Sequence, residues 1–209
     1  MSVETYDGDH ARQEIDQFSG YTTAPEQGAW LFAHGMLRDP YADYQLVTER
    51  PWERPGSEAY VMQFAITGPD GLASHFIAKA CIKIPVTPSL GDWLMRREVL
   101  AQRGVVVPRL HAVNRGVLIE EYIPYDFRSA YHMADDRNRG QLAEAFIDTY
   151  RRVYETGFRP TSLHDVRSHG SDVVMVDFGS DLGGIHASSP QMGSASIVEA
   201  ARMQLGRFM

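Results

Sequence analysis

One tight turn constrains the fold of this chain more than any other feature of the sequence. Gly68-Pro69-Asp70-Gly71 separates two strand-like runs, 59–67 and 75–84, rich in apolar and β-branched residues. Two such runs joined by a short turn with glycine and proline predict an antiparallel hairpin. A preceding run at 45–48, followed by a turn at 51–57, predicts a third strand. The three strands are expected to form an antiparallel meander.

Helical periodicity flanks this meander and continues through the second half of the chain. Apolar residues recur at helical spacing in four segments: 26–37, 87–104, 138–154 and 197–205. In the first of them Trp30, Leu31 and Phe32 are the expected core contacts. Further strands are predicted at 105–107, 110–113, 116–123 and 173–176. The pattern as a whole predicts an α+β fold.

The composition of the chain argues against two classes of partner, nucleic acids and membranes. The net charge is −7 and no basic stripe is present, which argues against a nucleic-acid binder. No run approaches the roughly 18 apolar residues that span a bilayer, and the acidic start lacks the pattern of a secretory signal. The single cysteine, Cys81, allows no intrachain disulfide. We therefore expect a cytoplasmic protein that binds neither membrane nor nucleic acid.

Lys79 stands in the middle of the third predicted strand, among Phe, Ile, Ala and Cys. A lysine in such surroundings is costly to bury without an anionic partner. Glu98, on the helix that follows, is the expected partner. The alternative is a lysine on the wet face of a half-exposed sheet.

Asp177-Phe178-Gly179 follows directly on the apolar run at 173–176. An aspartate at the mouth of a buried strand can hold a divalent metal, and the glycine lets the backbone turn away. The alternative is an ordinary turn that ends a strand.

The order of these parts resembles the protein kinase and aminoglycoside phosphotransferase superfamily. In this sequence Lys79, Glu98 and Asp177 match the strand lysine, the helix glutamate and the Asp-Phe-Gly aspartate of that superfamily. The resemblance covers about 44–183. It implies a protein kinase-like two-lobe fold, with an antiparallel-sheet N-lobe carrying one main helix and a truncated helical C-lobe. The implied divisions are an N-terminal extension, 1–43, an N-lobe with hinge, 44–123, and a reduced C-lobe, 124–209.

The resemblance also implies how a nucleotide would be held. Gly56 and Ser57 stand where the phosphate-covering loop belongs, although one glycine replaces the usual three. Residues 119–124 resemble the hinge, so the Glu121 carbonyl and the Ile123 amide are expected at the adenine edge. The alternative for the hinge segment is an edge strand with exposed glutamates.

The loop before Asp177 departs from the kinase pattern, in which an asparagine follows the catalytic aspartate by five positions. If Asp165 is the base, Gly170 takes the place of that asparagine. If Asp165 itself takes that place, the next residues form the hairpin that leads to Asp177, but Pro160 replaces the base. The hairpin favours the second register. In both registers Asp165 and Asp177 face the nucleotide metal; the alternative is two unrelated surface aspartates.

The expected activity is an ATP- and Mg²⁺-dependent phosphoryl transfer to a hydroxyl of a small molecule, peptide or protein. Lys79 would hold the phosphates, and Asp165 would act as base or metal ligand. The alternative is a pseudokinase that binds nucleotide or serves as a scaffold and activates another protein. The short C-lobe favours a protein partner that completes it. A third possibility is an unrelated α+β binding domain.

Overall fold

The computed structural model describes residues 13, 15, 24–36, 45–51, 59–67, 71–81, 90–114, 116–160, 166–179, 182 and 193–207. The fold is α+β with antiparallel sheets, as predicted. The chain divides into two compact units: 1–90 with 109–122, and 91–108 with 123–209. None of the helices in the described ranges combines the length and apolar composition that a membrane span requires.

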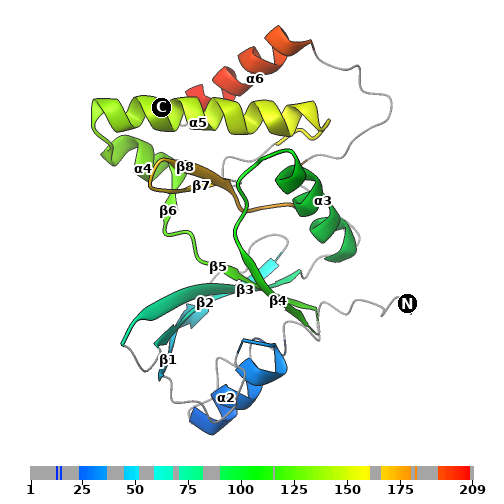
Figure 1. Ribbon diagram of the computed structural model, residues 1–209, viewed down its shortest axis with the longest axis vertical. Coiled ribbons are helices and arrows are strands. Elements are labelled where there is room, and N and C mark those ends of the chain that lie inside the picture. The colour runs from blue at the N-terminus through cyan, green and yellow to red at the C-terminus, as the bar shows by residue number, and fades with distance from the viewer. Residues whose placement is uncertain are drawn as a thin grey trace. The chain divides into compact units, whose positions relative to one another are not determined.

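The first unit is built on a five-stranded antiparallel sheet (Figure 1). The predicted meander of the first three strands is confirmed, and β2 has the predicted bounds. β5 inserts between β3 and β4, so the last two strands form a hairpin that pairs with β3. The strands, in the order β1-β2-β3-β5-β4, are β1 (Gln45–Pro51), β2 (Ala59–Thr67), β3 (Ala73–Cys81), β5 (Val117–Glu121) and β4 (Leu110–Asn114).

One face of this sheet forms the core of the first unit. The alternating apolar residues of β2, β3 and β5 share that face because side chains in a strand alternate between faces. Helix α2 (Ala24–Ala33) covers it with Trp30 and Leu31 (Figure 1). Phe32 was expected in the core but is 48% exposed, because successive helical residues are turned by about 100° and only two neighbours can face the sheet. The cluster comprises Ile15, Trp30, Leu31, Met62, Phe64, Phe76, Ala78, Val117 and Ile119.

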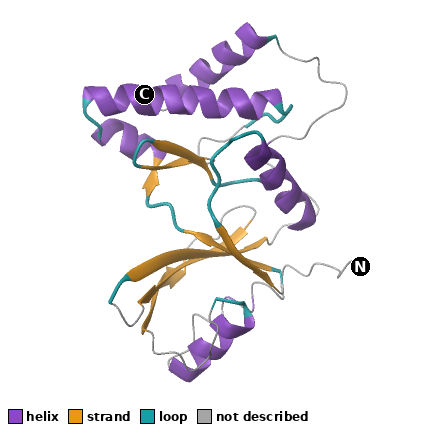
Figure 2. Cartoon of the chain, viewed as in Figure 1, coloured by secondary structure: helices purple, strands orange, loops and turns teal. Residues whose placement is uncertain are grey.

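The second unit combines helices with a three-stranded antiparallel sheet, drawn in purple and orange in Figure 2. The helices predicted at 87–104, 138–154 and 197–205 are confirmed with shifted ends, as is the hairpin before Asp177. The helices are α3 (Leu90–Gln102, of which all but Leu90 lie in this unit), α4 (Phe127–Met133), α5 (Asp136–Glu155) and α6 (Ser194–Gly206). The strands, in the order β6-β7-β8, are β6 (Tyr125–Asp126), β7 (Val166–His169) and β8 (Asp172–Met175).

The apolar stripe of α5 forms the core of this unit. The Phe146 ring packs between those of Phe127 and Tyr150, with centroid distances of 4.7 and 4.2 Å. Asp135 caps the start of the helix by accepting a hydrogen bond from the Asn138 amide at 2.8 Å. The buried residues of α5 lie on the face that its 3.6-residue period predicts.

The strand predicted at 105–107 is absent from the described structure. The Val105 amide donates to the Leu100 carbonyl and so closes the end of α3. The Val106 carbonyl accepts one hydrogen bond from the Met175 amide of β8, at 2.9 Å, without forming a ladder. The β-propensity of three valines is overridden because the helix end uses their backbone groups.

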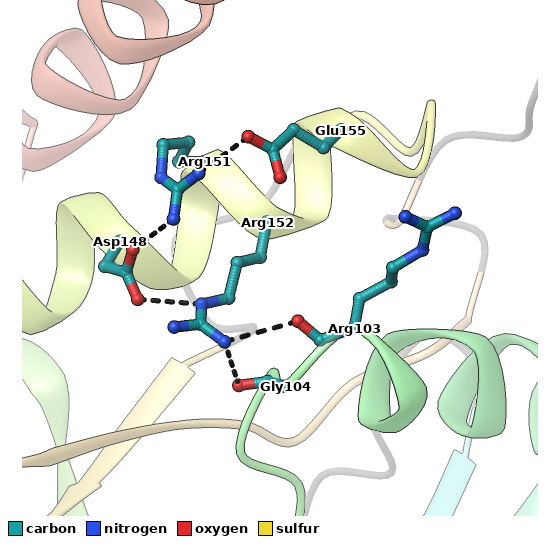
Figure 3. Close-up of polar contacts among 6 residues, drawn as sticks. All are labelled: Arg103, Gly104, Asp148, Arg151, Arg152 and Glu155. Carbon is teal, nitrogen blue, oxygen red and sulfur yellow. Dashed lines mark hydrogen bonds and ion pairs between the residues drawn. The ribbon is translucent and has the colours of Figure 1, made fainter.

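Arg152 of α5 clamps the end of α3 (Figure 3). Its Nη1 donates to the carbonyls of Arg103 and Gly104, at 3.3 and 3.2 Å. Asp148 holds the same guanidinium through Nε at 2.7 Å and also accepts from Arg151 at 2.6 Å. Carbonyls at a helix end lack intrahelical partners, and a cation there is favourable. The clamp thus joins the two helices by charge and hydrogen bonds.

Gly104→Ala is expected to lower the free energy of unfolding by about 1–2 kcal/mol, since Gly104 has a φ of +77° and an added Cβ would collide with the Arg152 guanidinium. Gly140→Ala is the matched control. It lies within α5 with nothing near its Cβ position, and should stabilise by about 0.5–1 kcal/mol. Urea denaturation measures both. Equal effects of the two substitutions would contradict the clamp.

Asp148→Asn should destabilise the protein in a pH-dependent way. The hydrogen bond from Arg151, followed by Arg152, holds the pKa of Asp148 below its ordinary 3.8. A lowered folded pKa contributes stability above pH 3.8 that is lost as the pH falls through the folded value. The difference in Tm between wild type and variant should therefore shrink between neutral pH and about pH 3. A difference in Tm that stays constant over that range would refute the lowered pKa of Asp148. Glu144→Gln on the same helix controls for the loss of one carboxylate.

Candidate functional site

Lys79 lies two residues before the end of β3 and is paired with a carboxylate of the neighbouring strand. Its Nζ is 2.8 Å from Oε2 of Glu120 on β5. The register sets Lys79 opposite Leu118 and Ile77 opposite Glu120, so the pair is a diagonal one on a single face of the sheet. That face is the one opposite to α2 and the apolar cluster of the first unit.

Burial separates this pair from a surface ion pair. The side chain of Lys79 is 17% exposed and that of Glu120 is 1% exposed. A charge so far removed from water is retained only when it is paired. The low exposure of Lys79 argues against the alternative, a lysine on a solvent-exposed face of the sheet. β5 is also a central strand rather than an edge strand, so Glu120 is not the exposed glutamate of the alternative reading.

The sequence-based reasoning missed Glu120. The run Val117–Glu121 ends in two adjacent glutamates, and alternation places one with Leu118 and the other with Ile119. Glu120 shares the Leu118 face and could have been matched to Lys79 once β5 was known to lie beside β3. That adjacency depends on a pairing between distant segments, which local pattern does not contain.

Asp177-Phe178-Gly179 is tied to α3 within the second unit. The Phe178 ring is fully buried and meets Trp93 edge to face, at 4.8 Å between centroids. Nη1 of Arg96 donates to the Gly179 carbonyl at 2.7 Å. Asp177 accepts from the Gly179 amide through Oδ1, at 2.9 Å, which forms a local turn. The aspartate is therefore held by its own backbone after a buried phenylalanine.

Asp177 has the surroundings of a possible magnesium ligand. Its side chain is half-buried, and no lysine or arginine in the described part of the second unit forms an ion pair with it. Magnesium prefers carboxylate oxygens and keeps several waters, so a partly exposed carboxylate fits. Asp165 lies outside the described residues. Within the described ranges no three His, Cys, Asp or Glu side chains gather as metal ligands.

Glu98, the predicted partner of Lys79, is exposed on α3 and accepts a hydrogen bond from Nε2 of Gln102 at 3.0 Å. Glu98 belongs to the second unit and Lys79 to the first. The Lys79–Glu98 pair therefore stays a prediction, while the carboxylate found beside Lys79 is that of Glu120.

The predicted hinge residues fall on either side of a unit boundary. The Glu121 amide donates to the carbonyl of Arg109, the residue before β4, at 2.9 Å. Ile123 is buried and begins the second segment of the other unit. Their joint contact with an adenine stays a prediction. Gly56 and Ser57, predicted at the phosphates, lie outside the described residues.

A hollow of about 500 Å³ opens in the second unit between α4, α5 and the β7–β8 hairpin. Neutral side chains line it, among them Tyr125, Met133, Asn138 and Gln141. None of the predicted site residues contributes to it.

No protein-family model matches the chain, and no curated protein matches it significantly.

Lys79→Met is expected to cost about 2–4 kcal/mol of stability, because it removes the cation from a buried carboxylate. Adding Glu120→Gln to that variant should restore part of the loss, since the buried charge is then gone as well. Arg137→Met, an exposed cation on α5, is the control and should change stability by less than about 0.5 kcal/mol. Urea titration compares all four proteins. A Lys79→Met effect as small as that of the control would contradict a stabilising pair.

Proposed function

We propose that the chain is a kinase-like, two-lobed phosphotransferase that uses ATP and Mg²⁺ and acts on a hydroxyl group. The observation that carries the proposal is the β7–β8 hairpin, which runs directly into Asp177-Phe178-Gly179. It presents the Asp177 carboxylate near the end of a buried strand, and no lysine or arginine in the described part of the second unit pairs with it, which suits a metal-binding position.

The first unit supports the same proposal. It carries a mostly buried lysine on the third strand of a five-stranded antiparallel sheet, with a carboxylate to orient it. In the kinase-like pattern a lysine at this place contacts the phosphates. β5 contains the first part of the predicted hinge at 119–124 and continues into its last part, 122–124. Glu120 of this segment is buried.

Each residue then has a defined role. Lys79 would bind the phosphates under the loop that contains Gly56 and Ser57, and the Glu121 carbonyl and Ile123 amide would bind the adenine edge. Asp177 and Asp165 would hold magnesium, which neutralises charge on the transferring phosphoryl group when bound. Phosphoryl transfer depends mainly on positioning and charge neutralisation, so the metal ligands matter more than a base.

The hairpin also bears on Asp165. β7 begins at Val166, immediately after Asp165, and the turn at Gly170 has a φ of +61°. This supports the register in which Asp165 is a metal ligand and Gly170 is only a turn residue. In that register Pro160 stands at the position of the base.

A pseudokinase is the second candidate, favoured by Pro160. Its side chain is buried, it has no group that can accept a proton in catalysis, and its carbonyl accepts from Nε2 of Gln204 at 3.4 Å. A chain of this kind would bind nucleotide, or act as a scaffold, and would regulate a protein partner.

Calorimetry with Mg-ATP tests the proposal. Asp177→Asn keeps an acceptor for the Gly179 amide but removes the charge, so it should weaken Mg-ATP binding by more than about tenfold. With magnesium chelated, ATP should bind the variant and the wild type alike. Asp172→Asn, exposed at the other end of β8, is the control and should leave binding unchanged.

Labelled ATP then separates the two candidates. Transfer of label to an added hydroxyl-bearing acceptor supports the phosphotransferase, and tight Mg-ATP binding without transfer supports the pseudokinase. Absence of binding at millimolar ATP would overturn both nucleotide-dependent readings.

A further inference from the structure

We propose that Glu120 is the positioning residue of Lys79, holding its ammonium where it can contact nucleotide phosphates. The resemblance assigns this role to Glu98. The inference rests on the proposed function and concerns which carboxylate of this chain serves the lysine.

The geometry of the two strands favours Glu120. β3 and β5 are joined by a continuous antiparallel register from Phe76–Glu121 to Ala80–Val117. Lys79 and Glu120 therefore project from neighbouring strands on one face of the sheet, where Nζ and Oε2 lie 2.8 Å apart. A contact built into a single sheet exists before any ligand binds.

Burial gives this contact its strength. Glu120 is 1% exposed, so its carboxylate is removed from water and its charge needs a cation. An ion pair shielded from water in this way is screened by salt much less than a pair on the surface. Glu98, by contrast, is exposed and already accepts a hydrogen bond from Gln102 on its own helix.

Holding the lysine in advance would favour binding. Fixing a free lysine side chain costs rotamer entropy. The ion pair with Glu120 orders the Lys79 side chain when the protein folds. Binding of a phosphate to Lys79 therefore loses less entropy. An ammonium has three donors, and one shared with Glu120 is compatible with a further bond to a phosphate oxygen.

The test compares ATP with adenosine, both measured by calorimetry on the full chain. Glu120→Gln should weaken Mg-ATP binding by about tenfold, because a neutral amide holds the ammonium less firmly. Adenosine has no phosphate, so its affinity should be unchanged. A purely structural defect would weaken both ligands equally, and that result would overturn the proposal.

Two further variants complete the experiment. In a Lys79→Met background, Glu120→Gln should have no further effect on Mg-ATP affinity, because the residue acts through the lysine. Glu26→Gln, an exposed carboxylate on α2 of the same unit, controls for net charge. Glu98→Gln is the competitor: if it weakens Mg-ATP binding and Glu120→Gln does not, Glu98 is the positioning residue and the inference fails while the proposed function stands.

A wild-type protein that binds no Mg-ATP would instead remove the proposed function. The inference would then fall with it, and the Lys79–Glu120 pair would be assigned to stability alone. The two failures are thus distinguished by the behaviour of the wild type.

Discussion

A buried charge must have an opposite charge beside it, and in the first unit this requirement joins Lys79 to Glu120. The pair is diagonal, so it forms only when Lys79 faces Leu118 across the ladder. A shift of β5 by one residue against β3 would move Glu120 to the face that α2 covers, into the cluster around Phe76. Lys79 would then lie on the other face of the sheet without this carboxylate beside it. Apolar packing on one face and the ion pair on the other therefore demand the same register. The ion pair therefore requires β5 to lie beside β3, which is the one neighbour relation in the described sheet that joins distant segments of the chain.

Much of the fold could be predicted from the sequence, and the exceptions have physical causes. α5 is long and strongly periodic, so its pattern predicts both the helix and its buried face. β2 is a nearly continuous apolar run before a turn, which predicts the strand but not which face is buried. α4 and β6 are too short for a period to be visible, although Asp126 caps α4 by accepting from the Ser129 amide. The strand expected at 105–107 failed because the end of α3 takes up the Val105 amide.

The candidate site shows the same division between local and distant information. Asp177 and the hairpin before it form one continuous segment, so sequence alone could place the aspartate at a strand end. The environment of Lys79 depends on the pairing of β3 with β5, two strands that α3 separates in the sequence. The expected partner was Glu98 of α3. Two arginines of α3 bind carbonyls of the second unit: Arg96 binds that of Gly179, and Arg97 binds that of Pro108 at 2.5 Å.

The strand order also determines when the first unit can be completed on the ribosome. β3 pairs with β2 as soon as both have left the exit tunnel, but its other edge waits for β5. Until then the growing chain carries an open, partly apolar strand edge at Phe76 and Ala78, of the kind that invites association between nascent chains. Helix α3 is translated during that wait. The sheet is therefore closed by a late hairpin, and its assembly overlaps with the start of the second unit.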